Sequence, residues 1–408
     1  MRADCDWIIH QAIAAVQPDA AVERALAGRD FGNGKLIVVA VGKAAWSMAA
    51  AARRILGERI NGGVVITKYG HAMGDIKGLK IFEAGHPVPD QNSFHATEAA
   101  LDATAGLTAQ DTVVFLISGG GSALFEAPCI APEESAALTR QLLACGADIV
   151  EMNTVRKRFS KVKGGRFAQH CSPARVYSIV LSDIIGDPLD MIASGPAYPD
   201  SSSAEDAVRI AQKYRLCLTD EMRSLLEVET PKQLDNVETM VTGSVRELCL
   251  AAAEAARQRG YTPVVLTDSL DCQAREAGSF LAALARYQQS AEHSVALIAG
   301  GETVVRLIGK GLGGRNQELA LSAAQGISGL RDTAVVSVGS DGTDGPTDAA
   351  GGYVDGDTAV ALQKRGISIY DVLERNDAYH ALEAVNGLIH TGPTGTNVND
   401  VSIVLMKR

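Results

Sequence analysis

The sequence predicts a doubly wound α/β protein, and two observations support this prediction. Short apolar runs recur along the chain, and most are continuously apolar instead of alternating, as in strands buried on both faces of a parallel sheet. Helix-like segments lie between these runs and give the strand–helix–strand order of layered α/β folds. The chain has 408 residues, which is enough for two or three domains.

The elements follow this order from one end of the chain to the other. In the first half the expected strands are 36–41, 63–67, 112–117 and 176–181, and the expected helices are 43–56 and 93–107. In the second half the expected strands are 262–267, 295–300, 333–338 and 401–406, and the expected helices are 244–260 and 316–327.

This order breaks between about Asp200 and Thr239, where two short helical stretches and Pro231 occur without a strongly apolar strand. We therefore expect a Rossmann-like α/β domain over residues 1–235 and a C-terminal α/β domain over residues 236–408. Each domain is expected to contain a mostly parallel sheet flanked by helices.

Composition excludes several classes of function. A net charge of −10 and a pI near 5.4 argue against a protein that binds nucleic acid or an anionic membrane. The seven cysteines show no CxxC spacing and the histidines no HExxH motif, which disfavours a zinc site and suits a reducing compartment. The start of the chain lacks a signal-peptide pattern. We expect a cytoplasmic protein without a nucleic-acid or membrane partner, and a homo-oligomer is compatible with this.

Three glycine-rich loops follow apolar segments of the chain, and the first of them carries Lys43. A lysine at the start of a helix opposes the helix dipole, so either Lys43 is a solvated surface residue or an anion lies beside it. The loop is not a Walker A motif, because Ile37 stands in place of its first glycine and Ala44 follows the lysine.

The second loop reads SGGGS and follows the expected strand 112–117. Consecutive glycines let backbone N–H groups curl around an anion, and the two hydroxyls add donors, although glycine also serves ordinary turns. We assign phosphate or substrate binding to its five residues, which are Ser118, Gly119, Gly120, Gly121 and Ser122.

The third loop contains Gly309, Gly311 and Gly314 in the pattern GxGxxG, which by itself is a weak dinucleotide signal. The acid that should close the following strand is missing, since Asp332 precedes that strand. Arg315 begins the next helix against its dipole, as Lys43 does, so a polyphosphate fits this loop better than a pyrophosphate.

Two further loops gather aspartates, Asp183 with its neighbours and Asp341 with its neighbours. Aspartate and glycine are common in plain turns, but Mg²⁺ needs only one or two protein carboxylates besides substrate phosphates and water. Cationic loops together with acidic strand ends are the recurring parts of phosphoryl transfer. Asp183 and Asp341 are therefore candidate metal ligands and catalytic residues.

The basic run 153–169 suggests nucleic acid at first sight, but the protein is acidic and the run is short. We expect about half of its charges to lie on a solvated helix face, and one or two to line the anionic site. Lys163 is assigned to that site, together with Gly314 and Asn316 beside Arg315.

As a set, these motifs resemble those of the glycerate 2-kinase family, whose members sometimes carry the name hydroxypyruvate reductase. The resemblance covers nearly the whole chain and rests on seven motifs in order, VGKAAWSM, LISGGGSALFEAP, NTVRKRFSKVKGGRFA, LSDIIGDPLDMIASGP, GGRNQELAL, DGTDGPTDAAGG and TGPTGTNVND.

The resemblance implies two α/β domains with the active site in the cleft between them. It also implies that ATP, with Mg²⁺, phosphorylates D-glycerate on its 2-hydroxyl to give 2-phosphoglycerate. Carried over by motif, Lys43 and Arg315 are the expected catalytic cations. Asp183 or Asp341 would hold Mg²⁺ or orient the hydroxyl.

Two other functions stay open at this stage. An NAD(P)H-dependent hydroxypyruvate reductase would explain the GKGLGG segment, but neither a hydride-side acid/base nor a ribose-binding acid is convincingly placed. A sugar- or nucleotide-sensing protein would also fit the fold, although simple binding does not need metal-ready carboxylates.

Overall fold

The computed structural model describes residues 1–182 and 184–408, which form two compact units. The first, which we call the parallel-sheet unit, comprises Val22–Ser182 and Asp187–Thr242. The second, which we call the mixed-sheet unit, comprises Met1–Ala21 and Gly243–Arg408 together with residues 184–186. The expected division at residues 235 and 236 stays a prediction about folding domains.

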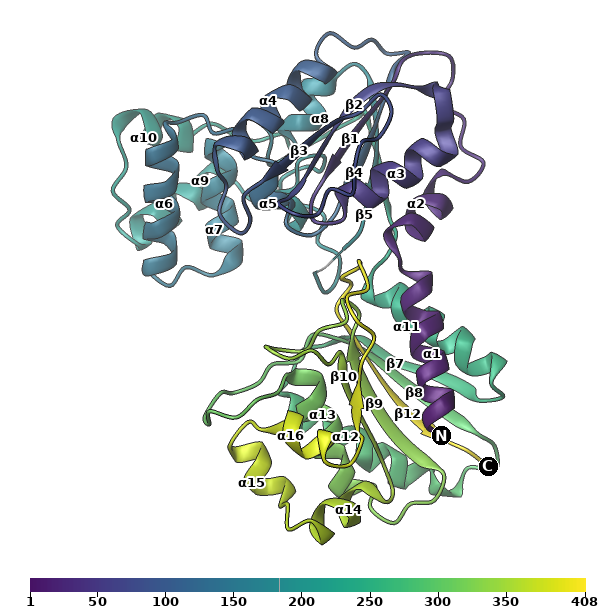
Figure 1. The fold of residues 1–408 in the computed structure, drawn as a ribbon. Helices are drawn as coiled ribbons and strands as arrows, with labels where there is room; N and C mark the ends of the chain where they lie inside the picture. The colour runs from purple at the N-terminus through teal and green to yellow at the C-terminus, as the bar shows by residue number, and fades with distance from the viewer. Residues whose placement is uncertain (183) are drawn as a thin grey trace. The chain divides into compact units, whose positions relative to one another are not determined.

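The parallel-sheet unit is built on six strands that are all parallel, in the order β3-β2-β1-β4-β5-β6 (Figure 1). The strands are β1 (Leu36–Val41), β2 (Ile60–Lys68), β3 (Lys80–Ala84), β4 (Thr112–Ile117), β5 (Arg175–Val180) and β6 (Val237–Val241). The helices are α2 (Pro18–Leu26), which belongs to this unit from Val22 on, α3 (Ala45–Leu56), α4 (Gln91–Thr104), α5 (Gly121–Leu124), α6 (Pro132–Ala144), α7 (Ile149–Arg156), α8 (Arg166–Cys171), α9 (Ala204–Lys213) and α10 (Asp220–Leu226).

The sheet of this unit is buried on both faces. Val39 and Phe115 belong to one apolar cluster with residues of α4 and α8, while Val38 and Val114 point to the other face and are fully buried there. Helices α6, α7, α9 and α10 contribute to a separate small core (Figure 1). The predicted parallel arrangement is therefore confirmed for this unit.

The mixed-sheet unit has six strands in the order β11-β10-β9-β12-β8-β7. They are β7 (Thr262–Leu270), β8 (Val295–Gly301), β9 (Thr333–Gly339), β10 (Gly351–Asp355), β11 (Leu388–Ile389) and β12 (Asp400–Met406). The helices are α1 (Arg2–Ala15), α11 (Val245–Gln258), α12 (Ala274–Tyr287), α13 (Arg315–Gly326), α14 (Thr358–Lys364), α15 (Ile369–Glu374) and α16 (Ala378–Glu383). Short 3-10 helices occur in both units: Gly57–Arg59, Lys157–Phe159 and Ile192–Ser194 lie in the parallel-sheet unit, and Gln288–Ser290 lies in the mixed-sheet unit.

Strand direction in the second sheet differs from the expectation. Of its pairings only β7 with β8 is parallel, whereas β12 runs antiparallel to both β8 and β9, and β10 antiparallel to β9 and β11. The apolar runs arose because helices cover both faces: Ile403 packs in the cluster with α1 and α11, and its neighbour Val404 in the cluster with α12 and α13. Continuous apolarity thus reports two-sided burial and not strand direction.

No helix within the described residues is long and apolar enough to cross a membrane. The acidic loop 340–350, which the sequence placed after a buried strand, connects the antiparallel neighbours β9 and β10.

Candidate functional site

Two of the predicted glycine-rich loops form one structure at the carboxyl end of the parallel sheet. Val41 and Ile117 are register partners at the ends of β1 and β4, so the segments that follow them leave the sheet side by side. The backbone N–H of Lys43 donates to the carbonyl of Gly119 at 2.8 Å, and that of Ala44 donates to Ser118 Oγ at 3.1 Å. The hydroxyl of Ser118 therefore holds Ala44, the residue that precedes α3.

Glycine is required where these loops touch. Gly42 has a φ of 117°, and a Cβ there would lie 2.3 Å from Ser118 Oγ. Gly120 has a φ of 87°, which L side chains rarely adopt. Gly42 thus permits the close approach of the two strand-end loops, and Gly120 supplies the positive φ that the SGGGS turn requires.

Lys43 leaves an unbalanced positive charge at this loop pair. Its side chain is half-buried, and its ammonium makes no hydrogen bond or ion pair among the described residues. The pKa of the neighbouring His86 is lowered by burial and then by the charges of Lys43 and Lys68. The local potential is therefore positive, which would stabilise a bound anion.

Lys163 supports the SGGGS loop from inside the protein. Its side chain is fully buried, and its ammonium lies 2.7 Å from Ser122 O, 3.2 Å from Phe125 O and 2.7 Å from Glu126 Oε2. Burial lowers the pKa of Lys163, and Glu126 opposes that shift. These three acceptors match the three N–H donors of an ammonium, so the charge of Lys163 is used inside the protein to hold the loop.

The other loop serine is also engaged. Ser194 Oγ donates to Ser122 Oγ at 3.0 Å and lies 3.1 Å from Asn153 Oδ1. Hydroxyls of the SGGGS segment therefore take part in holding the loop.

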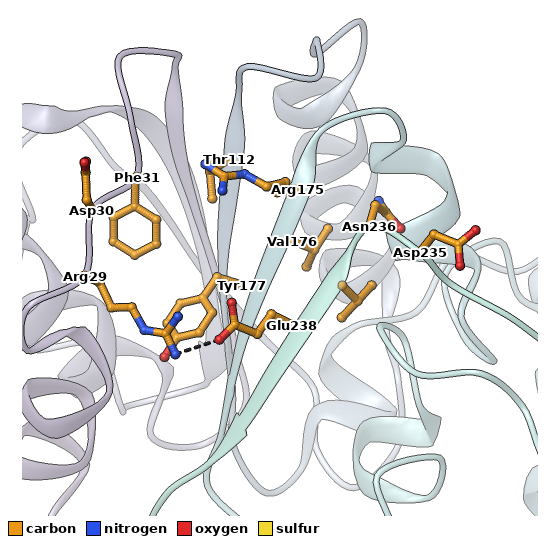
Figure 2. A pocket seen from close by; sticks show the side chains of 11 residues that line it. Arg29, Asp30, Phe31, Thr112, Arg175, Val176, Tyr177, Asp235, Asn236 and Glu238 are labelled. Atoms are coloured by element: carbon orange, nitrogen blue, oxygen red, sulfur yellow. Dashed lines mark ion pairs between the residues drawn. The ribbon is translucent and has the colours of Figure 1, made fainter.

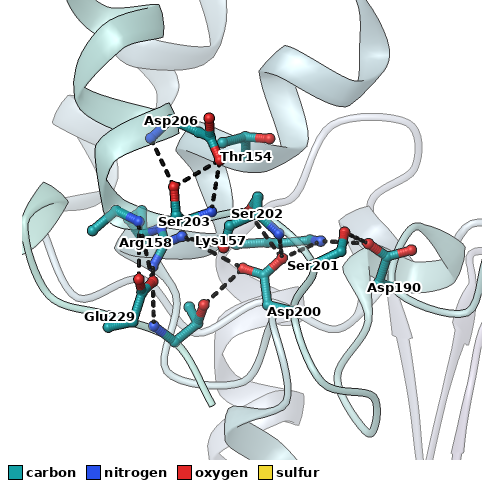
Figure 3. Close-up of polar contacts among 12 residues, drawn as sticks. Thr154, Lys157, Arg158, Asp190, Asp200, Ser201, Ser202, Ser203, Asp206 and Glu229 are labelled. Carbon is teal, nitrogen blue, oxygen red and sulfur yellow. Dashed lines mark hydrogen bonds and ion pairs between the residues drawn. The ribbon is translucent and has the colours of Figure 1, made fainter. Parts of the chain in front are cut away.

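Fewer charges of the basic run are solvated than the expected half, because Lys161 is exposed but the central residues are buried. Lys157 and Arg158 are fully buried, and Lys157 Nζ lies 2.9 Å from Asp200 Oδ1 (Figure 3). Arg158 Nη1 lies 2.5 Å from Glu229 Oε1, and Thr230 Oγ1 donates to the second oxygen of Asp200 at 2.8 Å. Burial alone would raise the pKa of Asp200, but Lys157 and the hydrogen bonds from Thr230 and Ser202 together lower it. The charges of Lys157 and Arg158 are therefore paired inside the protein.

Arg315, the other predicted cation, lies in the mixed-sheet unit as the first residue of α13. Its Nε lies 2.6 Å from Asp400 Oδ2, its Nη2 lies 3.0 Å from Asp400 Oδ1, and its Nη1 lies 2.6 Å from Glu302 Oε1. Burial alone would lower the pKa of Arg315, but Asp400 and Glu302 raise it above the usual value. The guanidinium is therefore charged and fixed in orientation.

Asp344 fills the helix N-terminus that the sequence left open for an anion. Its carboxylate accepts the backbone N–H groups of Asn316 at 3.1 Å and Gln317 at 2.9 Å, and also the Asn316 side-chain amide at 3.3 Å. A Cβ on Gly314 would lie 2.2 Å from Asp344 Cγ, so only glycine admits this approach. Burial raises the pKa of Asp344 to about 7. Asn316 is itself buried, and its side-chain amide contacts Asp344.

The GxGxxG loop is anchored to the turn 375–377. The N–H groups of Ile308 and Gly309 both donate to Asn376 Oδ1 at 2.8 Å, and that of Gly311 donates to Arg375 O at 2.8 Å. A Cβ on Gly309 would lie 2.2 Å from Arg375 O. The glycines therefore allow close packing of this loop.

A cavity of about 830 Å³ opens between this loop, α13 and the β9–β10 connection. Glu302, Lys310, Arg315 and Asp341 are among the residues that line it. Among the described residues, no group of three or more His, Cys, Asp or Glu side chains is arranged to hold a metal ion. Asp183, the other candidate ligand, lies outside the described residues.

Asp341 fits the more modest demand of magnesium. Its Oδ1 accepts the N–H of Thr343 at 2.9 Å, while its Oδ2 makes no hydrogen bond or ion pair within the described part of the chain. One such carboxylate oxygen, with substrate phosphates and water, suffices for Mg²⁺.

Sequence reasoning did not assign roles to Asp400, Glu302 and Asp344. Asp400 closes the quoted motif TGPTGTNVND, and Asp344 lies in DGTDGPTDAAGG, so both motifs contained the signal. A buried acid at the start of an apolar strand, as Asp400 is, needs a partner, and Arg315 supplies it.

Comparison with known proteins gives matches along most of the chain. A family model described as "Domain of unknown function (DUF4147)" matches residues 4–227, and the MOFRL family model matches residues 295–400. A protein of Thermotoga maritima named D-glycerate 2-kinase is 50% identical over 405 residues, which cover 98% of this chain and 97% of that protein. A glycerate 2-kinase of Pyrococcus horikoshii is 41% identical, with 98% and 96% covered.

A solved structure agrees with these matches. The crystal structure of a Thermotoga maritima glycerate kinase superimposes with a TM-score of 0.95 at 49% identity and covers 99% of both chains. A protein of Agrobacterium vitis with a provisional hydroxypyruvate reductase name is 39% identical, covering 91% of this chain and 100% of its own.

Proposed function

Because the chain belongs to the glycerate 2-kinase family, we propose that it transfers the γ-phosphoryl of ATP to the 2-hydroxyl of D-glycerate, giving 2-phosphoglycerate and ADP. The observation that carries this proposal is identity of 50% with a D-glycerate 2-kinase along nearly the whole of both chains. Both predicted cation loops lie within this shared length.

Lys43 would act on the charge of the transferring phosphoryl. Lys43 is half-buried, its ammonium lacks a protein partner among the described residues, and its charge helps to lower the pKa of His86. A preorganised charge of this kind can supply several kcal/mol of transition-state stabilisation.

Arg315 would act in the same way from the mixed-sheet unit. A guanidinium has five N–H donors, and Asp400 and Glu302 occupy three of them. Two donors therefore remain for phosphoryl oxygens, in a plane that Asp400 fixes.

Charge balance supports Mg²⁺ as the partner of ATP. The group of Arg315, Asp400 and Glu302 carries a net charge of −1, which would repel a free nucleotide phosphate. A divalent cation held by Asp341 and the phosphates would reverse this, and it would neutralise charge that develops during transfer. We retain Asp183 as a second candidate ligand.

The glycine loop SGGGS would receive an anionic group of a substrate near Lys43. Support comes from its position at the carboxyl ends of parallel strands, where open α/β sheets bind ligands. Lys163 and Ser118 would serve by holding the loop in shape, and Gly314 and Asn316 would serve Arg315 through Asp344.

A dinucleotide-dependent reductase would need a free helix N-terminus at the GxGxxG loop to bind the pyrophosphate. In a Rossmann loop the pyrophosphate occupies the helix N-terminus, and Asp344 accepts those N–H groups at α13. The loop glycines are used for packing against 375–377.

The test combines D-glycerate, ATP and Mg²⁺ with the full chain and follows products by phosphorus NMR, with NADH and hydroxypyruvate in a parallel cuvette. We expect 2-phosphoglycerate from the wild type and from Lys161→Ala, a control lysine in an exposed pair with Glu98. Lys43→Ala and Arg315→Ala should lose the signal while keeping the wild-type circular dichroism spectrum. NADH consumption without a phosphorylated product would reverse the proposal.

A further inference from the structure

His86 is a base at the carboxyl edge of the parallel sheet, close to Lys43 and the SGGGS loop. It lies in the connection 85–90 between β3 and α4. Strands β1 to β4 run parallel, so the segments that follow them leave the sheet at the same edge. A Cβ on Gly120 would lie 3.0 Å from His86 Cδ2, 3.1 Å from His86 Nε2 and 3.3 Å from Lys43 Cγ. The imidazole therefore lies against the SGGGS loop, beside the side chain of Lys43.

The connection that carries His86 is held at both ends. At its start the backbone N–H of Tyr69 donates to Ala84 O at 3.3 Å. At its end the Tyr69 hydroxyl donates to Asp90 Oδ2 at 2.7 Å, and Asp90 Oδ1 accepts the N–H of Ser93 at 3.0 Å. The histidine is therefore carried by a fixed segment of the same unit that carries Lys43.

The imidazole of His86 can be reached by a substrate. Neither ring nitrogen makes a hydrogen bond or ion pair to a residue in the part of the chain that the structure describes. The side chain is only partly buried, so these nitrogens are open to a small molecule that binds at the SGGGS loop.

The neighbouring groups that could accept a proton already have hydrogen-bond partners. Glu83 Oε1 accepts the N–H of Ala72 at 3.0 Å, and Asp90 is engaged at the start of α4. His71 Nδ1 lies 3.1 Å from Lys43 O, so this nitrogen carries a hydrogen and donates it. Among these residues, His86 is the base without a hydrogen bond of its own.

The charges around His86 are positive. The pKa of His86 is lowered from its ordinary value of 6.5, first by burial and then by Lys43, Lys68 and His71. The imidazole is therefore neutral at pH 7, and a neutral imidazole keeps one nitrogen that accepts a hydrogen. An anionic substrate is attracted to this edge by the same charges.

The opposite end of the same sheet lacks this positive charge. The cavity there is lined by two arginines and three acids, which leave a net charge of −1 (Figure 2). Arg29 pairs with Glu238 at 2.6 Å, so its charge is compensated. Within this unit an acid substrate is therefore drawn to the edge that carries His86.

We propose that His86 accepts the proton of the D-glycerate 2-hydroxyl as this oxygen attacks the γ-phosphorus of ATP. The new bond joins the 2-oxygen to phosphorus, and the bond from phosphorus to the bridging oxygen breaks. Its electron pair leaves with ADP, and the hydroxyl proton moves to a ring nitrogen of His86. This inference rests on the proposed kinase function and names the base for it.

Binding of the substrate anion would make His86 a better base. The carboxylate beside Lys43 compensates the charge that lowers the pKa of His86, so this pKa rises in the complex. The fall of kcat at low pH reports the complex, whereas that of kcat/KM reports the free enzyme. We therefore expect the fall of kcat to begin at a higher pH than the fall of kcat/KM for D-glycerate.

The test measures 2-phosphoglycerate formed by the full chain between about pH 5 and pH 8, with magnesium in excess over ATP. The wild-type kcat should fall about tenfold per pH unit below the pKa of His86. His86→Gln should lower kcat by at least about 100-fold with smaller changes in both KM values, and it should lose this fall at low pH. His86→Asn should behave alike, so the result does not depend on one variant.

Two other histidines serve for comparison. His293→Gln changes an exposed residue before β8 and should match the wild type in kcat and in its pH profile. His71→Gln should keep the fall at low pH, since we assign that fall to His86. Circular dichroism compares the fold of each variant with that of the wild type.

The outcomes separate this inference from the proposed function. A wild type that forms no 2-phosphoglycerate would overturn both. Product from the wild type, with a kcat of His86→Gln within about threefold of the wild-type value, would overturn the role of His86 alone. The same conclusion would follow if the fall at low pH persists in His86→Gln or disappears in His71→Gln.

Discussion

Arg315 and Asp400 meet through two parallel hydrogen bonds, with Nε 2.6 Å from Oδ2 and Nη2 3.0 Å from Oδ1. The two residues begin different elements, α13 and β12, and are 85 positions apart in the chain. The Asp400 side chain is only 7% exposed, whereas that of Arg315 is 34% exposed. The buried acid therefore fixes the plane of a cation whose other edge reaches the cavity.

Replacing Asp400 should disturb catalysis more than substrate affinity. In Asp400→Asn one of the two parallel bonds loses its acceptor, because the amide NH2 is a donor, and the other bond keeps only a neutral acceptor, so the guanidinium gains freedom. We expect kcat to fall by at least about tenfold, equivalent to about 1.4 kcal/mol, with a smaller change in KM for ATP. Initial-rate kinetics measure both constants.

Glu302→Gln is the matched control, since its side chain is 47% exposed and makes a single contact with Arg315. It should lower kcat less than Asp400→Asn does. Equal decreases in kcat for the two variants would contradict a special role for the buried pair of Arg315 and Asp400. An unchanged kcat in Asp400→Asn would show that Asp400 does not position Arg315 for catalysis.

Asp344 should make stability depend on pH in an unusual direction. Burial, opposed by the N–H groups of Gln317 and Asn316, raises its pKa from 3.8 to about 7. The folded state therefore binds a proton more tightly than the unfolded state between these values, so the contribution of Asp344 to stability falls as pH rises from about 4 to about 7. A single proton accounts for at most about 1.4 kcal/mol per pH unit.

Urea unfolding of the wild type and Asp344→Asn at several pH values measures this contribution as a difference. The wild type should lose stability relative to Asp344→Asn as pH rises through this window. The difference should level off above pH 7. Asp400 also lies near Asp344, so the test uses the difference between the two proteins and not the absolute slope. Parallel curves for the two proteins would mean that Asp344 is ionised throughout.

Local patterns predicted most elements because each depends on neighbours in the chain. The helix expected over 244–260 is α11, Val245–Gln258, and the strand expected over 401–406 is β12, Asp400–Met406. Local patterns could not predict the direction of the strands. Val404 and Ile403 would be equally buried in either direction, because helices cover both faces of the mixed sheet.

The sequence predicted the two cations of the candidate site, but it did not predict the residues that pair with them. Lys43 and Arg315 stand out because each opposes a helix dipole, which is visible locally. The pairing of Arg315 with Asp400 and of Lys157 with Asp200 joins residues far apart in the chain. Only the fold brings such residues together. The sequence therefore contained no sign that Lys157 is buried, and its charge was interpreted as part of a solvated helix face.

The glycines of the GxGxxG loop can be tested to decide whether they serve packing against 375–377 or the binding of a nucleotide. In Gly309→Ala the new Cβ would lie 2.2 Å from Arg375 O, so the loop must move away from 375–377. We expect a loss of about 1–3 kcal/mol in the free energy of unfolding, as for other overpacked sites. Gly313→Ala is the control, since its nearest contact would be 3.3 Å from Ala378 N, and its loss should be smaller.

Urea unfolding compares the two variants, and a titration with NADH followed by fluorescence accompanies it. Neither variant should change an NADH signal, because we expect none in the wild type. Saturable NADH binding that Gly309→Ala abolishes would return the loop to the dinucleotide interpretation.

The basic run offers a final comparison between a buried and an exposed lysine. Lys157 pairs with Asp200 with both side chains almost fully buried, while Lys161 pairs with Glu98 with both about half exposed. Removing one partner of a buried pair leaves an uncompensated charge, so Lys157→Met should lose about 3–5 kcal/mol of unfolding free energy. Lys161→Met should lose at most about 1 kcal/mol, since exposed pairs contribute little. Chemical denaturation measures both, and similar losses would mean that Asp200 is stabilised by Thr230 and Arg158 without Lys157.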